Sequence, residues 1–150
     1  MTWEDFKGNP KTISNSNTAA QTYCGFGFQT NHVTILARTK IFTKNTFACN
    51  LSWVRPDQKD RAELLEHEQG HFDLCEVYTR QLRKRLEEKK LTVFNLNTDA
   101  NSIFKDVYAL YLDRQELYEK QTNYGLDRQN QIEWKTTIKK ELNDLSSFTK

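Results

Sequence analysis

The sequence predicts an α+β fold, in which a small antiparallel β-sheet is followed by three helices. Between Ala20 and Val54 the chain is rich in β-branched and aromatic residues. After Pro56, apolar residues recur three and four positions apart, which is the spacing of a helix face. With 150 residues, 37% of them hydrophobic, the chain has apolar mass for one core, so we expect a single domain over residues 1–150.

Residues 1–20 are expected to form an ordered arm. They are polar and rich in turn formers, apart from Trp3 and Phe6, and Gly8-Asn9-Pro10 marks a break. Trp3 is the expected anchor of this arm.

The β region, residues 21–55, contains three runs with the composition of strands: Thr22–Phe28, Val33–Phe42 and Leu51–Val54. The segment Gln29–His32 is typical of a hairpin turn between the first two runs. His32 is then an exposed turn residue.

The helical region is expected over residues 57–147. Asp60, with Glu63 three positions later, indicates an N-cap and its capping-box partner for a long helix that runs to about Lys90. A second helix is expected to start near Thr98 or Asn101 and to end at Gly125, and a third follows Asp127.

Each predicted helix has an inward-facing stripe. On the first helix this stripe mixes apolar residues with two histidines: Leu64, His67, His71, Leu74, Tyr78 and Leu82. On the second helix it comprises Ile103, Val107, Leu110, Tyr111, Leu117 and Tyr118. On the third it comprises Ile132, Ile138, Leu142 and Leu145.

The segment His67-Glu68-Gln69-Gly70-His71 is the strongest indication of function. Residues four apart lie on one helix face with Cβ atoms about 5–6 Å apart, so both imidazoles can bind one zinc ion. Glu68 projects about 100° round the helix, beside the ion, where a general base for a metal-activated water has to stand. Gly70 lowers helix propensity, and we expect a strand or a substrate backbone to approach the helix closely there.

A catalytic zinc ion usually takes three protein ligands, so a third is required. Asp113 and Glu116 fall outside the apolar arc of the second helix, whereas Glu119 lies at its edge in line with Gln115, which ranks Glu119 first. Tyr124 is the next candidate, as a phenol ligand or as a donor to a developing oxyanion. Asp113, Glu116 and His32 stay as further alternatives. On the first helix, Asp73 and Glu76 point off the metal face and are candidates for orienting a ligand imidazole.

The charge balance argues against several partner classes. Lys and Arg total 22 against 20 Asp and Glu, so no global field favours nucleic acid or an anionic membrane. No segment approaches the roughly 18 apolar residues needed for a membrane span, and the given chain shows no signal peptide. Nothing in the sequence indicates an oligomeric state.

Three cysteines are an odd count. Cys24 and Cys49 lie in the β region and can pair if the chain meets an oxidising compartment, whereas Cys75 is expected to be a small buried thiol. No Cys-x-x-Cys spacing occurs, so zinc binding by cysteine is not expected.

The extended helix motif resembles that of a bacterial family of unknown function whose members are described as predicted secreted zinc-dependent proteases. The matching segments cover nearly the whole chain: Thr2–Phe6, Ser52–Val54, Leu64–Asp73 with Glu76 and Arg80, Gln115 through Tyr118, Glu119, Thr122 and Gly125 to Gln131, and Trp134.

The resemblance implies that His67 and His71 are zinc ligands, that Glu68 is the catalytic glutamate, and that the protein is secreted or periplasmic. In that family an aspartate is usual where this chain has Glu119, and a histidine is frequent where it has Tyr124. If that histidine is the family's third ligand, either Tyr124 takes its place or metal binding is weaker in this chain.

The sequence therefore favours a zinc-dependent metalloprotease, a hydrolase whose substrate is a peptide or protein. The alternative is a non-catalytic or degenerate zinc-binding module that recognises a partner protein. A metal-free helical interaction protein is a third possibility.

Overall fold

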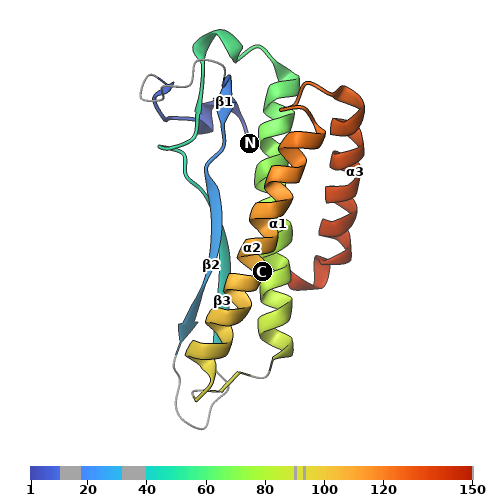
Figure 1. Cartoon of the computed structure of the whole chain (residues 1–150). Coiled ribbons are helices and arrows are strands. Elements are labelled where there is room, and N and C mark those ends of the chain that lie inside the picture. The colour runs from blue at the N-terminus through green and yellow to red at the C-terminus, as the bar shows by residue number, and fades with distance from the viewer. Residues whose placement is uncertain (11–17, 32–39, 90, 93, 150) are drawn as a thin grey trace.

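The computed structural model describes residues 1–10, 18–31, 40–89, 91–92 and 94–149. It confirms the predicted α+β arrangement, with a small antiparallel sheet followed by three helices (Figure 1). The strands are β1 (Ala20–Gln21), β2 (Cys24–Asn31), β3 (Lys40–Phe47) and β4 (Trp53–Val54). The helices are α1 (Ala62–Glu88), α2 (Leu96–Gln121) and α3 (Arg128–Asp144).

The long helix α1 is the centre of the molecule, in contact with α2, α3, β2 and β3. The three helices run up and down beside one another, with the β2–β3 ribbon along one side and α3 on the other (Figure 1). No helix within the described ranges is both long and apolar enough to cross a membrane.

The strands form two antiparallel pairs. β2 pairs with β3 from Cys24 opposite Phe47 to Asn31 opposite Lys40, and β1 pairs with β4. The hairpin turn predicted at Gln29–His32 is wrong, because its first three residues belong to β2. They find partners in the β3 ladder, and this pairing overrides their turn propensity. His32 and the predicted strand residues 33–39 lie outside the described residues.

The ends of the helices differ from the predictions in ways that neighbouring residues explain. Arg61, with extended backbone angles, is the N-cap of α1, so the predicted cap at Asp60 is wrong. A 3-10 turn at Pro56–Gln58 accepts the Arg61 main-chain N–H and delays the start of α1. α2 starts at Leu96, before the expected position, and ends at Gln121. Asp127 does cap α3, where its side chain accepts a hydrogen bond from the Asn130 N–H at 3.1 Å.

The main core lies between α1, α2, α3 and the β2–β3 ribbon. Its least exposed side chains include Leu74, Leu82, Val107 and Tyr118. The predicted inward position is wrong for three residues, because Leu110, Leu117 and Ile132 are 44%, 39% and 45% exposed. Only an arc of each helix meets a neighbour, and these side chains fall outside it.

A smaller core fixes the N-terminal arm. Phe6 is buried there with Ala20, Val54 and Leu64, and its ring makes edge contacts with Trp3 and Phe47. Phe6 is thus the deeper anchor, and Trp3, the predicted one, packs at its edge.

All three cysteines, Cys24, Cys49 and Cys75, are free thiols, so Cys24 and Cys49 form no disulfide here. Cys75 is fully buried, as predicted.

Candidate metal centre

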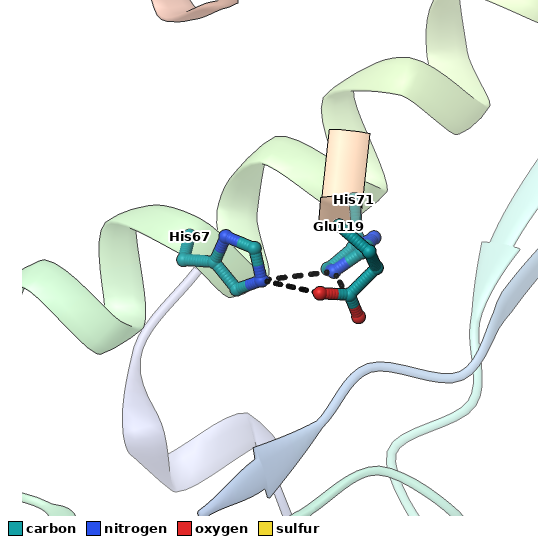
Figure 2. Close-up of side chains that lie close together, drawn as sticks. All are labelled: His67, His71 and Glu119. Carbon is teal, nitrogen blue, oxygen red and sulfur yellow. Dashed lines mark hydrogen bonds and ion pairs between the residues drawn. The ribbon is translucent and has the colours of Figure 1, made fainter. Parts of the chain in front are cut away.

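Two histidines of α1 and one glutamate of α2 gather at a single point (Figure 2). His67 and His71 point the same way because they lie one turn apart on the inward stripe of α1. The two Nε2 atoms are 3.2 Å apart. Glu119, near the end of α2, places one carboxylate oxygen 3.3 Å from Nε2 of His67 and the other 3.3 Å from Nε2 of His71.

These separations fit a metal ion. Four ligands arranged tetrahedrally at about 2.0–2.1 Å from zinc are separated from one another by about 3.3 Å. The two Nε2 atoms match that edge length at 3.2 Å, and each carboxylate oxygen of Glu119 matches it against one of them at 3.3 Å. One ligand atom from each of the three residues lies within 4.8 Å of the other two. A His67–His71–Glu119 group can therefore hold a metal ion.

Two glutamines fix which nitrogen of each histidine faces that point. Nδ1 of His67 lies 3.1 Å from Oε1 of Gln131, and Nδ1 of His71 contacts Oε1 of Gln115. An amide oxygen only accepts hydrogen bonds, so each imidazole carries a proton on Nδ1 and, when it is neutral, presents its Nε2 lone pair. The Nε2 atom of each neutral histidine is thus available to coordinate a cation.

The sequence did not identify these glutamines as groups that orient the histidines. That role was considered for Asp73 and Glu76, and it is wrong for both. Asp73 accepts a hydrogen bond from Gln69, and Glu76 pairs with Arg80. Gln115 lies one helical turn before Glu119 and shares its face, so its position in the sequence could have identified it as a group that orients a histidine.

Tyr118 ties the histidine helix to the other two. Its hydroxyl donates to the main-chain oxygen of His67 at 3.0 Å and accepts from Nε2 of Gln131 at 2.6 Å. Its ring stacks on the His67 imidazole, with centroids 4.8 Å apart. Burial raises the pKa of this phenol, so it remains a neutral donor.

Gly70 makes the position of Tyr118 possible. A Cβ atom at Gly70 would lie 2.2 Å from the Tyr118 hydroxyl. The close approach predicted at this glycine therefore exists, but a side chain of α2 makes it. The expectation of a strand or a substrate backbone there is wrong.

The turn between α2 and α3 closes one side of the centre. Asn123, Tyr124 and Gly125 have φ angles of 48°, 57° and 79°. A Cβ atom at Gly125 would lie 2.8 Å from Cγ of His67. Glycine satisfies both the left-handed backbone and the contact with the imidazole.

The charges of the centre reinforce one another. Burial alone would lower the pKa of His71, but its hydrogen bond to Glu119 and the negative charges of Glu68 and Glu119 raise it to about 8. Burial would raise the pKa of Glu119, but hydrogen bonds from His67 and His71 lower it to about 2. Without a bound metal ion, a proton on His71 offsets part of the negative charge of Glu68 and Glu119, which a bound cation would otherwise neutralise.

Glu68 lies beside the centre with an uncommitted carboxylate oxygen. The residue is 4% exposed, and its Oε2 atom has no hydrogen-bond partner within the described structure. It lines a cavity of about 440 Å³ together with His67 and Glu119. A buried carboxylate oxygen without a donor is costly, so its retention suggests a partner that enters this cavity.

The other predicted site residues differ in their relation to this cavity. Tyr124 lines it but is 69% exposed. Asp113 and Glu116 are exposed on α2 and take no part in the metal-binding group. His32 lies outside the described residues.

A comparison with known families gives one match. The family described as "Bacterial protein of unknown function (DUF922)" matches residues 12–125, which is most of the chain. The chain belongs to the DUF922 family. The matched segment of this DUF922 protein contains His67, Glu68, His71 and Glu119 and ends at Gly125, so Gln131 lies beyond it. No curated protein and no solved structure matches the chain.

Proposed function

We propose that this DUF922 protein is a zinc-dependent metallohydrolase that cleaves peptide bonds. The observation that carries the proposal is the His67–His71–Glu119 group with the unpartnered carboxylate oxygen of Glu68 beside it. Two of the three candidate ligands, His67 and Glu119, line one cavity together with Glu68.

The donor set favours zinc in a catalytic role. Two imidazoles and one carboxylate are a known ligand set of catalytic zinc sites, whereas structural sites are closed by four protein ligands. Within the described residues the group has three members, which leaves a position for water or substrate.

Each residue then has a defined task. When bound, zinc lowers the pKa of water and polarises a carbonyl group. His67 and His71 present Nε2 to the ion because their Nδ1 protons are committed to glutamine oxygens. Oε2 of Glu68 takes a proton from the attacking water and passes it to the leaving amine nitrogen. Tyr124, on the cavity wall, donates a hydrogen bond to the developing oxyanion.

Another part of the cavity wall suggests a peptide substrate. Ala19 and Ala20 line the cavity, and Ala20 begins β1. β1 pairs only with β4 among the described strands, so its second edge has no partner strand there. An extended peptide can bind such an edge through main-chain hydrogen bonds.

The direct test replaces the carboxylate of Glu68 by an amide. Glu68→Gln preserves shape but removes the base, so zinc content should remain stoichiometric while chelator-sensitive cleavage of a mixed peptide library falls by at least about 100-fold. Glu87→Gln, on the exposed end of the same helix, is the matched control and should leave both unchanged.

Two results would count against the proposal. A fully active Glu68→Gln variant removes the role assigned to Glu68. A zinc-loaded native protein that cleaves no peptide in the library favours the alternative, a non-catalytic zinc-binding module that recognises a partner protein.

A further inference from the structure

Arg61 extends the cavity away from the metal-binding group. It is the N-cap of α1 and lines the cavity together with His67, Glu68 and Glu119. It lies six positions before His67, a rise of about 9 Å along the helix. An extended chain advances about 3.3 Å per residue, so Arg61 lies within about three peptide residues of the bond to be cut.

The guanidinium group of Arg61 retains free hydrogen-bonding capacity. Its Nη1 donates to Oε1 of Gln58 at 3.0 Å, which is a neutral partner. No carboxylate pairs with it within the described residues, whereas Arg80, Arg114 and Arg128 each pair with a glutamate. A guanidinium has five N–H donors, so most of those on Arg61 remain available.

Arg61 also determines the charge of the cavity. Apart from the phenol of Tyr124, the other ionisable residues described on its wall are His67, Glu68 and Glu119, which lie at the candidate metal centre. Two glutamates balance one divalent cation, so Arg61 leaves the loaded cavity with a positive charge. The nearby wall residues Ala19, Ala20 and Leu64 are apolar and offer no competing acceptor side chain.

We propose that Arg61 binds a carboxylate of the peptide substrate, and thereby selects peptides with an acidic group close to the scissile bond. This inference rests on the proposed peptidase function. The carboxylate can come from an Asp or Glu side chain or from the free C-terminus of the peptide. Guanidinium groups bind carboxylates of both kinds through paired hydrogen bonds.

The experiment measures binding without cleavage. Fluorescently labelled octapeptides are titrated onto the zinc-loaded Glu68→Gln protein, and binding is followed by anisotropy. One set places Glu or Gln at each position in turn and has an amidated C-terminus. A second set compares free-acid with amidated C-termini, so the two sources of carboxylate are separated.

In at least one matched pair the carboxylate peptide should bind about 10-fold to 100-fold more tightly, the range for a hydrogen bond to a charged group. Adding Arg61→Gln should remove this preference, and Arg61→Lys should restore part of it. Arg85→Gln, at the exposed far end of α1, is the matched control and should retain it. Thermal unfolding of each variant verifies that the fold is intact.

The inference is overturned if no pair shows a carboxylate preference, if no peptide binds, or if the preference survives Arg61→Gln. Because the variant studied does not hydrolyse peptides, these outcomes are separate from the proposed function. Absence of cleavage by the native protein refutes the proposed peptidase activity but not the binding preference assigned to Arg61.

Discussion

Replacement of Gly70 by alanine tests whether Tyr118 positions the candidate metal ligands. In an exposed helix this change stabilises by up to about 1 kcal/mol. Here the added Cβ would lie 2.2 Å from the hydroxyl and 2.7 Å from Cζ of Tyr118, a fully buried side chain. Forcing a packed ring to move costs about 1–3 kcal/mol. Its hydrogen bonds to His67 and Gln131 contribute about 1 kcal/mol each.

The opposing contributions leave a net destabilisation of about 2–4 kcal/mol. For a chain of this size that corresponds to a melting temperature about 5–15 °C lower. Calorimetry with a chelator present isolates the packing effect from metal binding. Gly27→Ala is the control, because a Cβ there meets nothing within 4 Å.

A double variant identifies the cause. Tyr118→Phe removes the atom closest to the new methyl group, so the Gly70→Ala/Tyr118→Phe protein should be more stable than the two single changes predict by addition. A Gly70→Ala protein as stable as the native one would show that Tyr118 has room to move, and the packing argument would fail.

Three further predictions concern the metal. Gln131→Leu removes the acceptor that orients His67, so zinc affinity should fall about 10-fold to 100-fold; an unchanged affinity in a competition titration would contradict this role. Glu119→Gln should weaken zinc binding strongly while Glu116→Gln, exposed on the same helix, has no effect, as metal analysis after dialysis can verify. In the metal-free protein His71 has a pKa of about 8, so zinc must displace its proton at neutral pH. Apparent affinity should rise about tenfold per pH unit up to about pH 8 and level off above it, and a constant affinity between pH 6 and pH 8 would exclude that protonation.

Helical periodicity was sufficient to predict the parts of the centre that lie on one helix. His67 and His71 share a face because they are one turn apart, and the same reasoning placed Glu119 at the edge of the inward arc of α2. The structure brings these three residues together.

Contacts between helices could not be predicted from the same pattern. Gln131 reaches His67 only because α3 is rotated to present that side to α1, and no local period in α3 encodes this rotation. The partner of Gly70 is equally non-local, since a small residue indicates a close approach without saying which element makes it. The prediction that Leu110 and Leu117 face inward was wrong because apolar residues also occur at exposed helix positions.

The order of the elements along the chain has a consequence for biosynthesis. The imidazole of His67 takes its orientation from Gln131, which lies 64 positions later. Until the ribosome has produced α3, the histidines exist but Gln131 does not yet accept the Nδ1 proton of His67. The contact that orients His67 toward a cation therefore forms only after α3 has been synthesised.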